Sequence, residues 1–398
     1  MKSLGIYLKP YIKESILAPI FKFLEVLFDL LVPVVVAQII DVGVANNNHT
    51  YIVERFGVLL IMAAVGLTCS ITAQFFAAKA SVGFATRVRK AMFEHVQTLS
   101  FTEIDTLGAD TLITRLTDDV NLVQNGLNIA LRLMLRSPFI VIGAMVMAFT
   151  INVKCAIVFV VTIPILFVVI LSIMLVSIPL FKKVQSRLDR VTRLTMENLT
   201  GVRVIRAFCR EEQSVAEFED SNRELTRLNE FVGRISVLMN PVTYVLINIG
   251  AVVLVYKAGV QVNLGNMQQG QVVALYNYML QIIVELIKMA SMIITLNKSM
   301  ACADRIANVL NVKSSMEYPQ NESKKVDNSD TAVKFKDVTF TYSGAGASSL
   351  SNISFKAKKG QTIGIIGGTG SGKSTLISLI PRFYDAVKGN VLIDGQNV

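Results

Sequence analysis

The chain has 398 residues and a formal net charge of +10; 52% of the residues are hydrophobic and only 17% are charged. Ordinary soluble domains carry about 25% charged residues, so this composition excludes a disordered chain and an ordinary soluble enzyme and indicates several membrane spans. Four cysteines exclude a disulfide framework, and basic residues that are mixed with acidic ones between apolar runs argue against nucleic-acid binding.

Long apolar runs occupy the N-terminal part of the chain. A helix needs about 20 residues to cross the roughly 30 Å hydrocarbon core of a bilayer, and six runs reach that length. The first run is the least uniform, because it contains Lys22, Glu25 and Asp29. We predict transmembrane helices near 16–40, 57–80, 131–151, 155–180, 238–260 and 271–296.

The connections between the predicted spans alternate in length and in charge. The loops after spans one, three and five are short and hold few Lys or Arg residues. The loops near 81–130 and 181–237 are long, and the second of them holds eleven Lys and Arg residues. Because basic loops stay in the cytoplasm, we predict a multi-pass plasma-membrane protein whose N-terminus, long loops and C-terminal tail are cytoplasmic.

The long loops have the periodicity of amphipathic helices. Apolar residues recur every three to five positions with charges between them, as at Val191, Leu194, Leu199 and Val202. No cluster of Pro and Gly separates this pattern from the spans. We therefore expect the membrane helices to continue into the cytoplasm as helical hairpins, in preference to a separate peripheral helical domain.

The pattern changes after the sixth span, where residues 312–332 are polar and rich in Asn and Ser, as linkers are. Short alternating runs then predict strands in VKFKDVTFTY, NISFKAKKG and GNVLIDGQN, and QTIGIIGG predicts a more buried strand. A helix is predicted at 373–383. We assign a transmembrane domain to 1–311, a linker to 312–332 and the first part of a nucleotide-binding domain to 333–398.

The strongest chemical signal is a glycine-rich loop between the buried strand and this helix. The loop fits the pattern G-x-x-x-x-G-K-[ST], in which glycines let backbone N–H groups point at phosphate oxygens and the helix N-terminus adds a partial positive charge. We predict that Lys373 reaches the β- and γ-phosphates and that Ser374 binds Mg²⁺. The predicted nucleotide-binding residues of the loop are Gly367, Gly368, Thr369, Gly370, Ser371, Gly372, Lys373, Ser374 and Thr375.

Tyr342 ends the first predicted strand and is a second candidate ligand. An aromatic ring at this position either stacks on a purine base or is buried as a strand-end tyrosine. The residues alone do not separate these two possibilities.

The chain resembles the ABC exporter family over nearly its whole length: six predicted spans with two long helical loops precede a phosphate-loop domain. The segments that carry the resemblance, besides the loop, are LITRLTDDV (112–120), ENLTGVRVIRAFCREE (197–212), VTFTY (338–342), LIPRFYD (379–385) and GNVLIDGQNV (389–398). The first two look like the regions of the family's coupling helices. Shorter segments, LKPY, TINVK and NYMLQI, are similar to bacterial multidrug exporters built from two different subunits.

This resemblance implies an α-helical membrane protein, with six transmembrane helices and long cytoplasmic helical extensions, followed by a partial α/β P-loop ATPase domain. It implies ATP and Mg²⁺ as cofactors, with Tyr342 stacked on adenine and Thr375 near the α-phosphate. It also implies ATP-driven export of small amphipathic or hydrophobic compounds by alternating access, in a homo- or heterodimer with a second ABC half-transporter surrounded by membrane lipids. A lipid or peptide exporter and an ATP-gated channel or regulator are the alternatives.

The chain departs from the family pattern near residue 398. The family's glutamine segment, LSGGQ signature, acidic pair and switch histidine have no counterpart, and His49 and His95 lie far upstream. We therefore expect only the first part of an ATPase domain, without catalytic residues. Such a segment would contribute to ATP binding but would not hydrolyse ATP alone, whereas the full-length protein would be an ATP-hydrolysing translocase.

Ionisable residues inside membrane spans are costly and usually face an interior or a watery cavity. Lys22, Glu25 and Asp29 share one helical face, and they either line the transport pathway or form an ion pair between helices or subunits. Glu285 and Lys288 are three residues apart, which favours mutual neutralisation.

The basic residues Arg203, Arg206 and Arg210 share one face of the second long loop, where we expect them to meet acidic groups. The cysteines have no metal-ligand spacing and are expected to be packing residues. They are Cys69, Cys155, Cys209 and Cys302.

Overall fold

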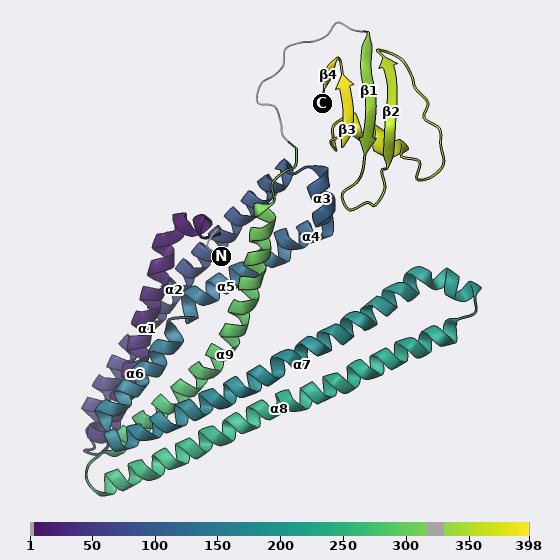
Figure 1. Ribbon diagram of the computed structural model, residues 1–398. Coiled ribbons are helices and arrows are strands. Elements are labelled where there is room, and N and C mark those ends of the chain that lie inside the picture. The colour runs from purple at the N-terminus through teal and green to yellow at the C-terminus, as the bar shows by residue number, and fades with distance from the viewer. Residues whose placement is uncertain (1–3, 317–329, 398) are drawn as a thin grey trace. The chain divides into compact units, whose positions relative to one another are not determined.

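A computed structural model describes residues 4–316 and 330–397 of the chain (Figure 1). The described residues group into two compact units. We call the first, which contains the β-sheet, the sheet unit; it comprises Met1–Ile12, Lys79–Leu127 and Asn297–Val398. We call the second the helical unit; it comprises Lys13–Ala78 and Asn128–Leu296.

Long helices account for nearly all of the described chain before residue 312. They are α1 (Ile12–Gln38), α2 (His49–Thr98), α3 (Phe101–Leu107), α4 (Ala109–Thr114), α5 (Val120–Leu133), α6 (Arg136–Ile151), α7 (Val153–Ala207), α8 (Glu211–Asn263) and α9 (Gln269–Asn311). A 3-10 helix at Leu4–Tyr11 precedes α1, and π-helical segments at Ile39–Val44 and Arg115–Asp119 follow α1 and α4.

Five helical stretches in the described residues are long and apolar enough to cross a membrane. In addition, α7 begins with a shorter apolar stretch, Val153–Val169. The expected helical membrane protein with several apolar helices is therefore confirmed. The count of six spans and the domain boundaries stay predictions, and most of the predicted linker lies outside the described residues.

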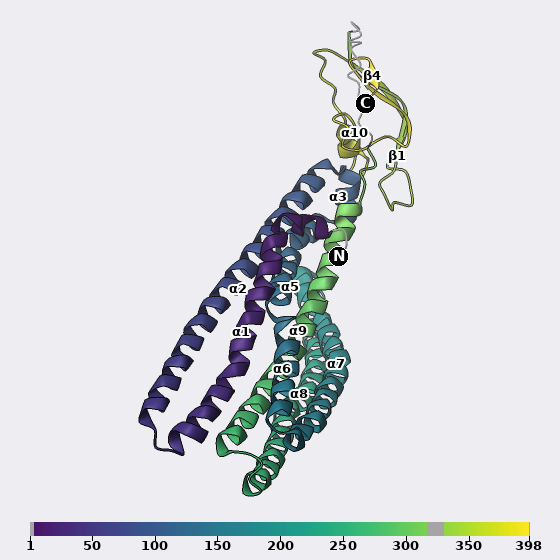
Figure 2. The same ribbon diagram turned by 90° about the vertical axis from the view of Figure 1, so that its left-hand side faces the viewer.

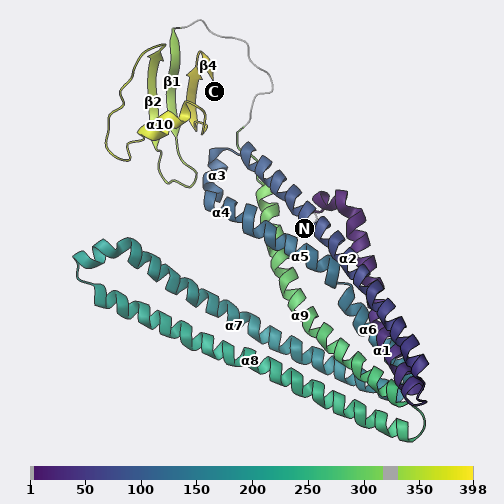
Figure 3. The same cartoon turned by 180° about the vertical axis from the view of Figure 1, so that it is seen from behind.

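The hairpin of α7 and α8 is formed by helices of 55 and 53 residues that run side by side and are joined at Phe208–Arg210 (Figures 1 and 3). Each helix continues without a break from its apolar part into its charged part, as the periodicity of the long loops predicts. Near the turn the hairpin buries little: Leu199, Val204 and Phe208 are 68%, 61% and 73% exposed.

The core of the helical unit lies where α1, α6, α7, α8 and α9 pack together. Its largest fully buried side chain is that of Tyr278 on α9, whose hydroxyl donates a hydrogen bond of 2.5 Å to the backbone carbonyl of Leu30 on α1. Small residues bring the helices close: a Cβ on Gly250 of α8 would lie 2.4 Å from the Met279 side chain of α9. This position therefore requires glycine.

Within the sheet unit, a buried ion pair fastens the segment LITRLTDDV to α9. Arg305 donates two hydrogen bonds to the Asp119 carboxylate, at 2.9 and 2.5 Å. Burial alone would raise the pKa of Asp119, but hydrogen bonds from Arg305, Cys302 and Arg115 together hold that pKa below its ordinary value. Asp119 is therefore ionised, and its negative charge is compensated by both arginines.

The sheet contains four antiparallel strands in the order β2-β1-β3-β4, with bounds Thr331–Phe340 (β1), Leu350–Lys358 (β2), Lys388–Ile393 (β3) and Gln396–Asn397 (β4). The short helix α10 (Lys373–Leu379) lies on one side of the sheet (Figure 2). Leu376 and Leu379 of α10 pack with Phe335 and Val338 of β1. The strands predicted at VKFKDVTFTY, NISFKAKKG and GNVLIDGQN are confirmed.

Two predicted elements of this region are wrong. The run QTIGIIGG forms no strand, and Ile366 within it is 99% exposed. A buried strand needs neighbours that supply hydrogen bonds and cover, and among the described residues β1 is already paired on both edges, with β2 and β3. The helix predicted to reach 383 ends at Leu379, because Pro381 disfavours helical backbone in the residue before it.

Candidate nucleotide-binding site

The glycine-rich loop wraps around the side chain of Lys373, the first residue of α10. The Lys373 ammonium donates hydrogen bonds to the backbone carbonyls of Gly367 (2.9 Å) and Gly368 (2.7 Å) and to the Ser371 hydroxyl (3.3 Å). The positive charge is thus held over the loop at the N-terminus of a helix. Both features favour a bound anion.

Glycine is required at the end of the loop for two independent reasons. Gly370 and Gly372 have φ values of +84° and +85°, a conformation that other residues adopt only with strain. A Cβ on Gly372 would also lie 2.8 Å from the Leu350 side chain and 2.9 Å from the Ser349 carbonyl oxygen. The loop therefore passes directly against the start of β2.

Tyr342 and Thr375 are brought together by a hydrogen bond that the sequence does not predict. The Tyr342 hydroxyl donates to the Thr375 hydroxyl at 3.1 Å, and Thr375 is buried. The tyrosine is thus tied to the first turn of α10, whereas Ser374 beside it is exposed. The arrangement places the two predicted ligand groups, ring and loop, in one site.

A second tyrosine, Tyr384, joins this site although sequence reasoning missed it. Its ring meets the Tyr342 ring edge-on, with centroids 5.3 Å apart, and its hydroxyl donates a 2.6 Å hydrogen bond to Asp105 of α3. Burial, followed by the hydrogen bond to Asp105, raises the pKa of Tyr384 to about 12. Tyr342, Tyr384 and Asp105 line a cavity of about 330 Å³. The segment RFYD after α10 was the available signal.

These residues fit a nucleotide with Mg²⁺ by their chemistry. The fixed ammonium of Lys373 suits phosphate oxygens, the exposed Ser374 hydroxyl suits Mg²⁺, and the Tyr342 ring beside a cavity suits a base. The individual roles stay predictions, as does the proximity of Thr375 to the α-phosphate.

The two functions of the Tyr342 side chain can be separated by substitution. Tyr342→Phe keeps the ring and removes the hydroxyl bonded to Thr375, so we expect a stability loss of about 1 kcal/mol and unchanged ATP affinity. Tyr342→Ala also removes the ring and should weaken ATP binding by about 1–3 kcal/mol. Nucleotide titration of the purified variants measures both affinities. Equal ATP affinity of the two variants would show that the ring is not a ligand.

The charged residues of the first span form a network with Arg136, the first residue of α6. Lys22 is 2.5 Å from Glu25, and Arg136 bridges Glu25 (2.9 Å) and Asp29 (3.2 Å). Lys22 and Glu25 are buried, which favours an interhelical ion pair over a polar stripe in a pathway. Arg136 was not singled out from the sequence, because a lone basic residue at a helix start carries no distinctive pattern.

The acidic residue of the sixth span is neutralised as predicted. The Glu285 carboxylate accepts a hydrogen bond from the Ser137 hydroxyl at 2.7 Å and pairs with Lys288 at 3.0 Å. The Arg136 guanidinium lies 3.8 Å from Glu285. One arginine therefore connects carboxylates from α1 and α9.

The remaining singled-out residues form no site. In the part of the chain that the structure describes, Arg203 and Arg206 make no ion pair, so the expected acidic partners are not found there, and Arg210 bonds Gln213. Cys69, Cys155 and Cys302 are buried, Cys209 is exposed, and the described residues contain no cluster of potential metal ligands.

Comparisons with known proteins agree with this architecture. Residues 15–286 match the family model described as ABC transporter transmembrane region, and residues 350–398 match the model described as ABC transporter. An uncharacterized ABC transporter ATP-binding protein of Mycobacterium tuberculosis is 34% identical over 392 residues, which are 98% of this chain and 67% of the relative.

Two relatives from other bacteria have the same extent. The uncharacterized ABC transporter ATP-binding protein YfiB of Bacillus subtilis is 32% identical over 392 residues, with 98% of this chain and 68% of the relative covered. The putative ABC transporter ATP-binding protein exp8 of Streptococcus pneumoniae is 25% identical over 402 residues, with 100% and 68% covered.

Proposed function

The chain belongs to the ABC transporter family, and we propose that it is one half of an exporter that uses ATP to move amphipathic or hydrophobic compounds, of the multidrug type, across the plasma membrane. The observation that carries the proposal is the loop closed around Lys373, in a chain whose other part is a bundle of long apolar helices. A phosphate-binding site and a membrane domain in one chain suit transport driven by a nucleotide.

In this proposal two halves, identical or different, pair in the membrane and bind ATP between their ATPase domains. Lys373 and Ser374 hold the triphosphate and its Mg²⁺, and Tyr342 holds the base; ATP supplies the free energy. The tip of the α7–α8 hairpin, Asn198–Phe208, contacts the partner's ATPase domain and passes its movement to the membrane helices. The helices then change from inward-facing to outward-facing.

Transport is tested with inside-out membrane vesicles that contain the protein and a fluorescent amphipathic amine. We expect ATP, but not ADP, to drive accumulation of the amine against its gradient. ATP-dependent flow that only equilibrates the compound would instead identify a nucleotide-gated channel, and accumulation of a labelled phospholipid or peptide alone would identify the lipid or peptide exporter.

The proposed orientation predicts which positions react with an impermeant thiol reagent in intact cells. Cysteine at Asn47 or Gln268, which lie in connections between apolar helices, should be labelled from outside, because those connections carry few basic residues. Cysteine at Ser186 should be labelled only after permeabilisation. Labelling of Ser186 in intact cells would overturn the proposed orientation.

The coupling role of the hairpin tip is tested at two positions near the end of α7. A cysteine at Thr200 should cross-link to the partner subunit, and Arg206→Glu should lower transport severalfold while ATP affinity stays unchanged. Arg193→Glu, farther from the turn, is the matched control and should transport normally. Cross-links of Thr200 within its own chain only, or normal transport by Arg206→Glu, would contradict this role.

A further inference from the structure

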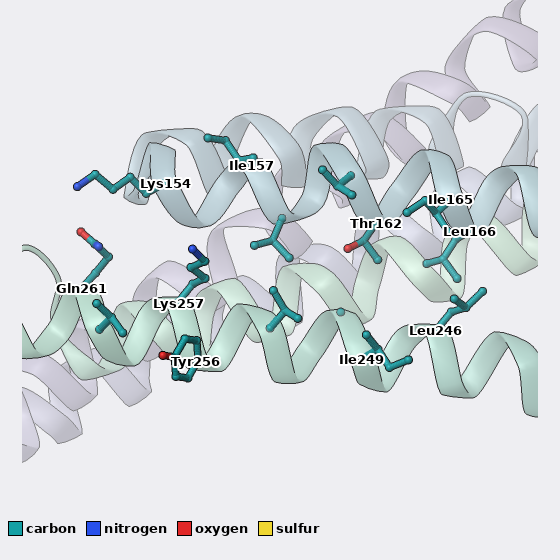
Figure 4. A pocket seen from close by; sticks show the side chains of 15 residues that line it. Lys154, Ile157, Thr162, Ile165, Leu166, Leu246, Ile249, Tyr256, Lys257 and Gln261 are labelled. Carbon is teal, nitrogen blue, oxygen red and sulfur yellow. The ribbon is translucent and has the colours of Figure 1, made fainter.

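An apolar groove runs between α7 and α8 in the helical unit and has a volume of about 720 Å³ (Figure 4). It extends along α7 from Lys154 to Leu166, which is about 18 Å at 1.5 Å per helical residue. Half of the hydrocarbon core of a bilayer is about 15 Å. The groove therefore has the length of one lipid leaflet.

The polar side chains of the groove are gathered at one end. Lys154 on α7 and Tyr256, Lys257 and Gln261 on α8 lie there, and Figure 4 shows the Lys257 ammonium and the Gln261 amide turned toward α7. This is the end at which α7 begins and α8 ends, so it lies at the membrane–water interface if these helices span the bilayer. Lysine and tyrosine are common at that depth.

The two lysines have no negative partner in the described residues. None of the side chains that line the groove is acidic, and no ion pair or side-chain hydrogen bond of Lys154 or Lys257 is found in the part of the chain described. Two like charges beside an apolar groove repel each other, and a neutral helix packed on them would bury them unpaired at a high cost. The occupant that suits the groove is anionic at one end and apolar along the rest.

We propose that this groove binds one acyl chain of an anionic phospholipid, whose phosphate is held by Lys154 and Lys257. The chain lies along Ile165, Leu166 and Val253 toward the middle of the membrane. Lysines outside a groove would attract any anionic surface, whereas here the apolar length and the charged end together select a lipid of this charge. The assignment does not depend on the transported compound.

Native mass spectrometry of the detergent-purified protein measures the binding of phosphatidylglycerol and of phosphatidylcholine with the same acyl chains. We expect phosphatidylglycerol to bind more tightly, and Lys154→Gln/Lys257→Gln to weaken its binding about 30-fold, since each lysine near an anionic lipid is worth roughly a factor of five. Val253→Trp, which fills the groove, should weaken the binding of both lipids. Lys182→Gln/Lys183→Gln, also on α7 but outside the groove, is the matched control and should bind both lipids as the wild type does.

Three results would overturn the assignment. Equal affinity for the two lipids in the wild type would remove the role of the lysines, and unchanged binding in both the double lysine variant and Val253→Trp would place the lipid elsewhere. A cysteine at Val253 that cross-links to a second subunit in lipid-containing membranes would show that a protein chain occupies the groove.

Discussion

Replacement of Lys373 by alanine should weaken ATP binding at least about 100-fold and abolish ATP-driven transport. The Lys373 ammonium is the only full positive charge that the structure places on the described loop, and charge-assisted hydrogen bonds to phosphate contribute about 1.5–3 kcal/mol each. The same ammonium bonds the carbonyls of Gly367 and Gly368, so its loss also loosens the loop. Both effects act in the same direction.

Photo-cross-linking with an azido-ATP measures the affinity, and vesicle uptake measures transport. Lys359→Ala is the matched control: this lysine is in the same region, pairs with Asp394 at 3.3 Å on the surface and is remote from the loop in sequence. It should bind ATP normally. ATP affinity within about threefold of the wild type in Lys373→Ala would remove the nucleotide assignment from the loop.

Replacement of Arg136 by methionine should destabilise the protein by about 3–5 kcal/mol. The side chain is similar in length but leaves Glu25 and Asp29 without the guanidinium at 2.9 and 3.2 Å, and removal of one partner from a buried ion pair leaves an uncompensated charge. Glu25 is buried, so water does not replace the lost contact. Thermal unfolding in detergent measures the effect.

A surface ion pair in the same unit is the matched control. Arg187 lies 2.8 Å from Glu224, but their side chains are 45% and 54% exposed, so Arg187→Met should cost no more than about 1 kcal/mol. Adding Glu25→Gln to Arg136→Met should recover part of the loss, because it removes the stranded charge. Equal effects of the two arginine substitutions would mean that the network is hydrated, and the alternative of a polar stripe lining the pathway would be favoured again.

The sequence predicts those parts of the fold whose causes are local. Hydrophobic periodicity continues from the apolar stretch of α7 through Val191 and Leu194, and the helix does not break before Phe208. Alternation of apolar and polar residues likewise predicts β1 and β2. The phosphate loop is predictable because its glycines and lysine are fixed by backbone geometry within nine successive residues, Gly367–Thr375.

The features that the sequence does not predict depend on distant segments. Arg136 meets Glu25 only because α1 and α6 pack side by side, and no sequence spacing records that contact. The Tyr384 hydroxyl likewise reaches Asp105 across 279 positions. The strand expected at QTIGIIGG fails for the same reason: an apolar run becomes a strand only where neighbouring strands pair with it.

The exposed end of the α7–α8 hairpin bears on how much of the protein a cell accumulates. Apolar side chains such as Leu199 and Phe208 face water there, and a two-helix segment with so few buried contacts opens locally at low free energy. Cellular proteases cleave such openings, so a copy made without its proposed partner is degraded faster than an assembled one. The abundance of this half should therefore follow the abundance of the other, and overproduction of one half alone should yield little additional protein.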